Sequence, residues 1–183
     1  MLARKMRRIW NRKTAALAVA LFTALGSGNV QAMPENGSVK AGSANISQSG
    51  NTMDIQQNTS KVAIDWTGFD IHKQETVNFH QPDASSVALN RVLSNSATEI
   101  YGNLNANGRV FLINPNGVLF GQGAEVNVGG LVASTRDISN ENFMKGEYTF
   151  SGNSDAAVIN AGTIKAEGGV VAMLARDAEN TGS

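Results

Sequence analysis

The stretch Gly108-Arg-Val-Phe-Leu-Ile-Asn-Pro-Asn-Gly-Val-Leu-Phe-Gly121 sets two short apolar runs on either side of Asn114-Pro115-Asn116-Gly117. The runs, Val110 to Ile113 and Val118 to Phe120, are too short for buried helices and carry the β-branched and aromatic residues of packed strands. Pro115 presets φ at the second turn position, the Asn114 side chain can bond the backbone two residues on, and Gly117 tolerates the exit geometry. A strand, a sharp corner and another strand, with no polar loop between them, predict a chain that winds.

A weak internal repeat extends this pattern along the chain. Asn-x-Gly occurs at Asn127, Asn160 and Asn180, and the last two asparagines are 20 residues apart. The first gap of 33 residues becomes about 20 if residues 137–155 contain an insertion of roughly 13. Units of this length predict an all-β parallel β-helix with about seven rungs. A β-sandwich, which also uses short strands, is the alternative, and 19 Gly against 3 Pro favour winding.

Other segments give weaker signals. Short strands are expected at 38–41 and 53–56, and period-2 alternation from Lys61 onward predicts further strands. Residues 81–98 favour a strand plus a loop over one helical turn. The polar segment 137–155 is expected to leave the coil as an insertion containing a small hairpin.

Residues 1–32 have the composition of a secretory signal peptide. Six basic residues precede the uncharged run Thr14 to Leu25, and Val30-Gln31-Ala32 provides small residues at −3 and −1 of a cut before Met33. The run is too short to span a bilayer comfortably. We therefore predict a signal peptide at residues 1–32 and an exported domain at residues 33–183. Since the chain stops directly after an Asn-Thr-Gly corner, we also expect a longer rod.

The net charge limits the classes of binding partner, and the cysteine content limits how the domain can be stabilised. Six of the 15 basic residues lie in the signal and none of the 15 acidic ones do, so residues 33–183 carry a formal charge of −6. A mildly acidic surface argues against nucleic acid and anionic membranes. The chain has no cysteine, so its stability has to come from core packing and hydrogen bonds.

Enzymatic and metal-binding patterns are weak. His72 and His80 are expected to be surface or rim side chains, and no HExxH or nucleophile-elbow motif accompanies them. The adjacent Arg136 and Asp137 are expected to form a rim ion pair rather than a catalytic one. We predict no enzyme activity, no cofactor and no metal, with a self-contained carbohydrate-binding or polysaccharide-lyase-type β-helix as the alternative function.

Three longer motifs resemble a known family. They are Ala88-Leu-Asn-Arg-Val92, the stretch Gly102 to Gly121, and Leu131-Val-Ala-Ser-Thr-Arg-Asp-Ile-Ser-Asn-Glu-Asn-Phe143. Together they resemble the N-terminal secretion domain of two-partner-secretion exoproteins, the filamentous-haemagglutinin-like proteins, with the high-molecular-weight adhesin branch nearest. The resemblance runs from about residue 38 to the end. A second Asn-Pro-Asn motif that some members carry nearer the N-terminus is missing here.

The resemblance implies a right-handed parallel β-helix with an N-terminal cap and small side elements. It also implies that residues 33–183 are a secretion domain, exported through the periplasm of a Gram-negative bacterium to the cell surface or the medium. An outer-membrane pore partner would recognise this domain in the periplasm through polypeptide-transport-associated domains. Our hypothesis for the mechanism is that folding of the β-helix starts as the domain emerges at the cell surface. The family's secretion motifs fall on Asn114, Pro115, Asn116 and Gly117, and on Asn90 and Arg91. Chemistry alone favours a corner that no partner touches for Asn114 to Gly117, and it allows Arg91 to be a satisfied rim residue.

Overall fold

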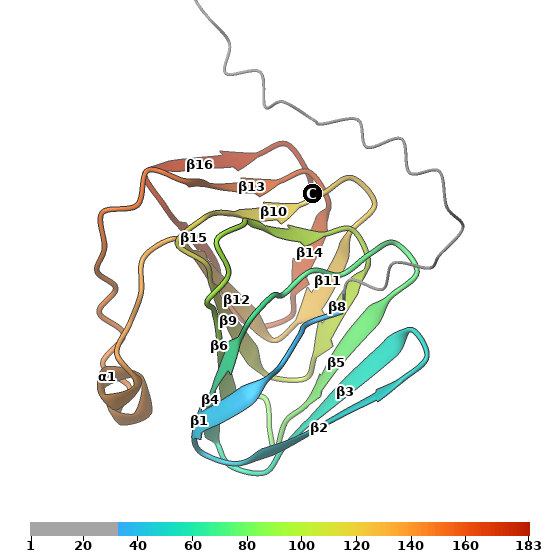
Figure 1. Ribbon diagram of the computed structural model, residues 1–183, viewed down its shortest axis with the longest axis vertical. Helices are drawn as coiled ribbons and strands as arrows, with labels where there is room; N and C mark the ends of the chain where they lie inside the picture. Colours follow the sequence, from blue (N-terminus) through green and yellow to red (C-terminus); the bar gives the residue numbers. More distant parts are fainter. Residues whose placement is uncertain (1–32) are drawn as a thin grey trace, which may run out of the picture. The chain divides into compact units, whose positions relative to one another are not determined.

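The computed structural model describes residues 33–183, which form a β-structure with one short helix (Figure 1). The strands are β1 (Ser38–Ala41), β2 (Ala44–Ser49), β3 (Thr52–Gln57), β4 (Lys61–Trp66), β5 (Thr76–His80), β6 (Val87–Val92), β7 (Thr98–Ile100), β8 (Asn103–Ala106), β9 (Arg109–Ile113), β10 (Val118–Phe120), β11 (Glu125–Val128), β12 (Gly130–Ser134), β13 (Ala157–Asn160), β14 (Thr163–Ala166), β15 (Val171–Leu174) and β16 (Asp177–Asn180). The helix, α1, spans Asn140–Lys145. Residues 81–98 hold strand and loop without a helical turn, as predicted.

The strands stack into three sheets, and successive strands visit the sheets in turn. The first sheet has the order β1-β4-β6-β9-β12-β15, the second β16-β13-β10-β7 and the third β14-β11-β8-β5-β3-β2. From β3 onward every pairing between neighbouring rungs is parallel. The three sheets are named the first, second and third sheets in this order. This topology confirms the predicted parallel β-helix and excludes the sandwich, which needs antiparallel sheets.

The solenoid has about five turns, so the prediction of seven rungs is wrong. Two parts of the chain account for the difference. Residues 33–57 supply a cap and one strand of the first turn, and residues 137–155 lie outside the coil. Neither segment adds a turn, although both contribute to the chain length on which the estimate rested.

The cap covers the N-terminal end of the solenoid with strands that pair antiparallel to their neighbours. β1 pairs with β4 and β2 pairs with β3, both antiparallel, and β2 and β3 are joined by a two-residue turn at Gly50 and Asn51. A bulge interrupts β1 between Val39 and Ala41. The strands expected at 38–41 and 53–56 are thus present, whereas β2 was not predicted because its residues are mostly polar and small.

The core is filled by inward-facing side chains from all three sheets. Alternate residues of a strand point to one face, so β4 buries Val62, Ile64 and Trp66, each with no exposed surface. Trp66 meets Phe69 edge to face, with ring centroids 5.4 Å apart. Burying such large side chains stabilises the coil by roughly 2–3 kcal/mol each.

The register corrects the interpretation of the repeat. Asn160 and Asn180 are paired in neighbouring rungs, which confirms the 20-residue unit. One rung earlier, however, the residue beside Asn160 is Phe120. Asn127 lies in β11 of the third sheet, where it is paired with Asn105. The Asn-x-Gly at Asn127 is therefore a chance match in another sheet.

Residues 137–155 leave the coil, as predicted, but they contain the helix α1. An antiparallel bridge between Asp137 and Ser151 closes the base of the insertion. Ser139 caps the helix by accepting the Asn142 N–H, and Gly146 ends it in the left-handed conformation with φ 84°. Because Ser139 and Gly146 are ordinary capping signals, the helix was readable from the sequence; the expected hairpin is reduced to the single bridge.

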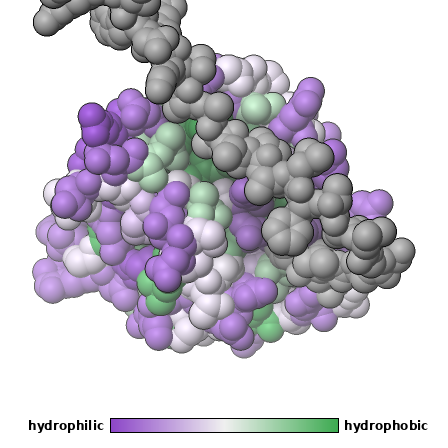
Figure 2. Space-filling view, turned by 45° about the horizontal axis from the view of Figure 1, so that its top comes forward, coloured by the Kyte–Doolittle hydropathy of each residue, from purple (hydrophilic) through white to green (hydrophobic). Residues whose placement is uncertain are grey.

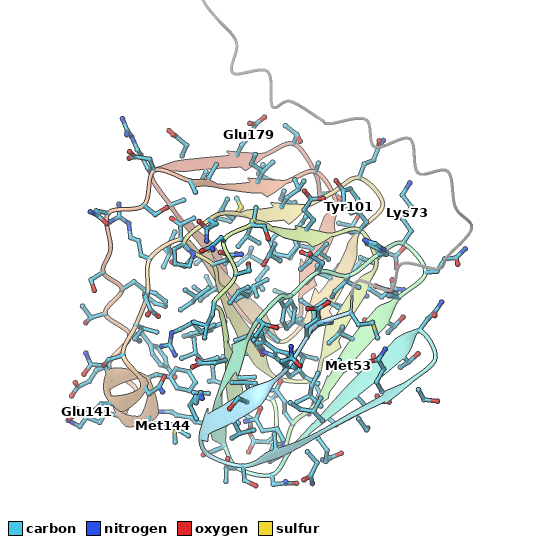
Figure 3. The ribbon with its side chains drawn as sticks, in the orientation of Figure 1. Met53, Lys73, Tyr101, Glu141, Met144 and Glu179 are labelled. Atoms are coloured by element: carbon cyan, nitrogen blue, oxygen red, sulfur yellow. The ribbon has the colours of Figure 1, made fainter. Side chains whose placement is uncertain are left out.

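Against the outer face of the first sheet, the insertion forms a second apolar cluster. Phe143 of α1 is fully buried there against Phe111 of β9, with ring centroids 5.9 Å apart. Glu141 and Met144 lie on α1, outside the sheets (Figure 3). On the face seen in Figure 2, hydrophilic residues surround a few hydrophobic ones.

The predicted signal peptide, residues 1–32, lies outside the described residues. In the part that the structure describes, no helix is long and apolar enough to cross a membrane.

Candidate recognition site at the Asn114–Gly117 corner

The four residues Asn114 to Gly117 form the predicted tight corner between β9 and β10. The Gly117 N–H donates to the Asn114 carbonyl at 3.0 Å, and the Asn116 N–H donates to Asn114 Oδ1 at 2.9 Å. Gly117 has φ 114°, a conformation that glycine adopts without strain. The corner is therefore built by the local turn chemistry that the sequence displays.

Asn114 also joins its own rung to the two neighbouring rungs. Its side chain has no exposed surface, and its Nδ2 donates to the Ser96 carbonyl at 3.0 Å and to Thr98 Oγ1 at 3.1 Å. Its backbone N–H donates to the Ser134 carbonyl at 2.9 Å. Every polar group of this side chain is bonded, so Asn114 is a structural residue of the corner.

Pro115 and Asn116 form the exposed part of the corner. Asn116 Nδ2 donates to the Ser94 carbonyl at 2.7 Å, and the Pro115 carbonyl accepts from Ser154 Oγ at 2.5 Å. Leu93, on the preceding rung, is 59% exposed. These loops from three rungs expose apolar Leu93 and Pro115 together with the amide of Asn116.

Asn90 and Arg91 lie beside the corner, because β6 pairs with β9. Asn90 is opposite Leu112, and Arg91 is opposite Ile113, the residue before Asn114. The structure therefore brings the two motifs to neighbouring rungs at the same end of the first sheet. Consecutive strand residues point to opposite faces, which separates the roles of Asn90 and Arg91.

Asn90 points into the core and is completely buried. Its Oδ1 accepts from Trp66 Nε1 at 3.0 Å, and its Nδ2 donates to the Phe111 carbonyl at 3.4 Å. The amide thus satisfies the indole N–H of the largest core side chain. A buried amide without these bonds would destabilise the fold by roughly 1–3 kcal/mol, which identifies Asn90 as structural.

Arg91 points outward and anchors the insertion. Its guanidinium donates to Asp65 Oδ1 and Asp137 Oδ1, both at 2.9 Å, to Asn140 Oδ1 at 3.0 Å and to the Ile138 carbonyl at 2.5 Å. The Arg91 side chain is only 13% exposed. Burial disfavours the charged guanidinium and by itself would lower the pKa of Arg91. The hydrogen bonds and negative charges of Asp137 and Asp65 have the larger effect, so the pKa of Arg91 is raised above its ordinary value.

This clamp corrects the expected pairing of Arg136 with Asp137. Asp137 binds Arg91, whereas Arg136 Nη1 donates to the Gly152 carbonyl. The side chains of adjacent residues in an extended segment point in opposite directions. Asp137 therefore binds Arg91 of a distant rung instead of its neighbour Arg136. Asp65 and Asn140 were missed because nothing in the local sequence connects them with Arg91.

The two histidines are on the surface, as predicted. His72 is exposed, and His80 Nε2 is 2.8 Å from Asp54 Oδ1. Across residues 33–183, no group of three or more His, Cys, Asp and Glu side chains is placed to hold a metal ion.

Comparison with known proteins identifies relatives over nearly the whole described region. The family model of the TPS secretion domain matches residues 30–183. The HMW1 secretion domain from Haemophilus influenzae has a similar structure, with a TM-score of 0.75 and 36% sequence identity; the match covers 81% of this chain and 41% of that one.

Two curated relatives are named heme/hemopexin-binding protein, both from Haemophilus influenzae. The relative from strain Rd is 47% identical over 122 residues, which is 67% of this chain and 14% of the relative. The second is 46% identical over 99 residues, 54% of this chain and 11% of the relative. This chain thus spans a small part of the length of these relatives.

Proposed function

Because the chain belongs to the family of TPS secretion domains, we propose that an outer-membrane pore partner recognises it in the periplasm and exports the exoprotein that carries it. Exoproteins of this family are secreted through the periplasm of Gram-negative bacteria. In this proposal residues 1–32 direct the chain across the inner membrane and are then removed. The periplasmic transport-associated domains of the pore partner are the binding surface for residues 33–183.

The observation that carries this proposal is the extent of the family match. It covers the cap, all the turns of the solenoid and the insertion, with the Asn114–Gly117 corner intact at its centre. A solenoid of stacked rungs is suited to directional export, because each rung that emerges can fold onto the one before it. Folding free energy gained at the cell surface then opposes backward movement.

We propose that Asn114 and Gly117 act by building the corner, and that Pro115, Asn116 and the neighbouring Leu93 form its exposed surface. The burial of Asn114 supports this division, since a fully bonded and inaccessible amide has no capacity left for a partner. Asn90 and Arg91 support the same surface indirectly, one from the core and the other by holding the insertion.

The domain's role is transport rather than the activity of the exported protein. The family is one of secretion domains and not of enzymes. The same fold occurs in the HMW1 secretion domain, and closely similar sequences occur in heme/hemopexin-binding proteins. We propose that this domain serves an adhesin, a haemagglutinin or a heme-acquisition protein in the same way, without catalysis, cofactor or metal.

Export of a reporter tests the proposal. A reporter fused after Ser183 is produced with and without the cognate pore partner, and the extracellular fraction is measured. We expect export only when both residues 33–183 and the partner are present. Equal extracellular reporter without the partner would overturn the proposal, and a matched fusion lacking residues 33–183 controls for leakage.

A further inference from the structure

The outer face of the third sheet carries a ladder of polar side chains, one from each successive rung. Asp54, Asn78, Asn105 and Asn127 are paired in register across β3, β5, β8 and β11. Asn127 Nδ2 donates to Asn105 Oδ1 at 3.3 Å, Asn105 Nδ2 donates to Asn78 Oδ1 at 3.0 Å, and Asn78 Nδ2 donates to Asp54 Oδ1 at 3.1 Å. All the bonds run in the same direction.

Asp54 fixes that direction. Its carboxylate accepts from His80 Nε2 at 2.8 Å as well as from Asn78, and these hydrogen bonds, His80 first, lower its pKa. An ionised carboxylate can only accept, so each amide above it is oriented with its N–H toward Asp54. The ladder is therefore ordered before any ligand arrives, which reduces the entropy that binding costs.

Each ladder amide keeps unused hydrogen-bonding capacity. Asn78 and Asn105 each donate one N–H and accept one bond within the ladder, which leaves a second N–H and a second lone pair. The three asparagines are half-buried and lie on the outer face of the sheet, since the alternate residues Val77, Leu104 and Val126 are buried in the core. A donor and an acceptor are thus repeated once per rung, about 4.8 Å apart.

This ladder forms the floor of a groove. Two adjoining hollows, of about 450 and 500 Å³, share Ala106, Asn107 and Asn127. Gln81 and Ala84, in the loop after β5, contribute to one side, and Lys165 and Glu167 lie at the far end. Asn107 is held in place because its Oδ1 accepts the Gln81 N–H at 2.7 Å and its Nδ2 donates to the Gln81 carbonyl at 2.8 Å.

We propose that this groove binds a neutral, linear oligosaccharide. A sugar hydroxyl group both donates and accepts a hydrogen bond, which matches the unused N–H and the unused lone pair of each ladder amide. The spacing between rungs is also close to the length of one hexose residue. Lys165 and Glu167, which line one end of the groove, carry opposite charges, so neither sign of charge dominates there. An extended peptide fits less well, because β5, β8 and β11 each have neighbours on both sides and no backbone edge is free.

Titration of purified residues 33–183 with short linear cello-, xylo-, malto-, manno- and chito-oligosaccharides tests the proposal. We expect at least one to bind, and Asn105→Ala to weaken that binding by about tenfold or more. Ala84→Trp, which places a large side chain in the groove beside Asn127, is expected to do the same. Asn103→Ala is the matched control, since Asn103 lies on the same face of β8 but bonds Thr76 and does not line the groove; it should leave binding within about twofold.

Three results would overturn the proposal. They are no binding by any of these sugars, equal loss with Asn103→Ala, and binding that depends on salt between ~0.05 and ~0.5 M NaCl, as a charged ligand at Lys165 would show. Thermal melting of each variant separates lost binding from lost folding. The result is independent of export, which needs neither the groove nor a sugar.

Discussion

Asparagines link neighbouring rungs in two regions of this molecule, the Asn114 corner and the ladder on the third sheet, with opposite consequences. Asn114 is completely buried, and its side-chain amide is fully bonded, to Ser96 and Thr98 of the neighbouring rung and to the Asn116 N–H of its own corner. Asn78, Asn105 and Asn127 bond one another in the same manner but stay half-exposed. The same residue type therefore stabilises the fold where it is enclosed and remains available to a ligand where it is open.

The largest expected effect is that of Asn114→Ala. The substitution leaves the Asn116 N–H, the Ser96 carbonyl and Thr98 Oγ1 without the partner they have now. Unpaired groups at a buried corner should lower the free energy of unfolding by about 2–4 kcal/mol, measured by urea denaturation. Asn116→Ala, which loses one exposed bond to Ser94, should cost roughly 0.5–1 kcal/mol. Equal losses for the two variants would contradict the assigned structural role of Asn114.

Arg91→Met is expected to have the next largest effect. The substitution removes the ion pairs of Arg91 with Asp65 and Asp137. The free energy of unfolding should fall by about 1–3 kcal/mol. This loss is smaller than that expected for breaking a fully buried ion pair, because the Asp137 side chain is 48% exposed. Limited proteolysis should then cut within residues 137–155 faster than it does in the natural chain.

Arg176→Met provides the control for that experiment. Arg176 pairs with Asp155, and both side chains are largely exposed, at 63% and 77%. We expect no measurable change in stability or in protease resistance, since such a pair is solvated. If Arg91→Met were equally silent, the Arg91 clamp would not be what holds the insertion against the solenoid.

Asn105→Ala should affect stability less than either corner variant. It breaks two ladder bonds at the surface, and water can replace both partners, so we expect a loss below about 1 kcal/mol by urea denaturation. A loss as large as that of Asn114→Ala would mean that the ladder is as structural as the corner, and the contrast between them would fail.

The smallest effect is the pH dependence introduced by Asp54. Its folded-state pKa lies below the ordinary 3.8, because His80 and Asn78 donate to the carboxylate. The carboxylate's contribution is therefore present above the unfolded-state pKa and is lost as the pH falls through the folded-state pKa. The stability advantage of the natural chain over Asp54→Asn should be constant near neutral pH and shrink below about pH 4. An advantage that grew on acidification would contradict the assigned direction.

Local chemistry explains why part of the fold was predictable. Asn114-Pro115-Asn116-Gly117 specifies its own turn, and the apolar runs beside it specify β9 and β10, so this corner was placed to within one residue. The helix α1 was missed although Ser139 and Gly146 mark its ends, because the polar segment was interpreted as a hairpin.

Contacts between rungs were not predictable from one sequence. Arg91 finds Asp65 and Asp137 at 26 and 46 residues' separation, and turns of unequal length hide such pairings. For the same reason Asn127 was aligned with Asn160, when its neighbours in the fold are Asn105 and Lys165. The ladder appears only once the rungs are in register.

We propose that the Asn114–Gly117 motif supports export by building a corner. Export of the reporter fused after Ser183, measured beside the free energy of unfolding for Asn114→Ala, Asn114→Asp and Asn116→Ala, tests it most directly. Asn114→Asp keeps the acceptor for the Asn116 N–H but loses the donor to Ser96 and Thr98. We expect export to fall in proportion to lost stability, with Asn116→Ala close to the natural chain. Abolished export by Asn116→Ala in a fully stable domain would contradict it and assign the motif to direct contact with the pore partner.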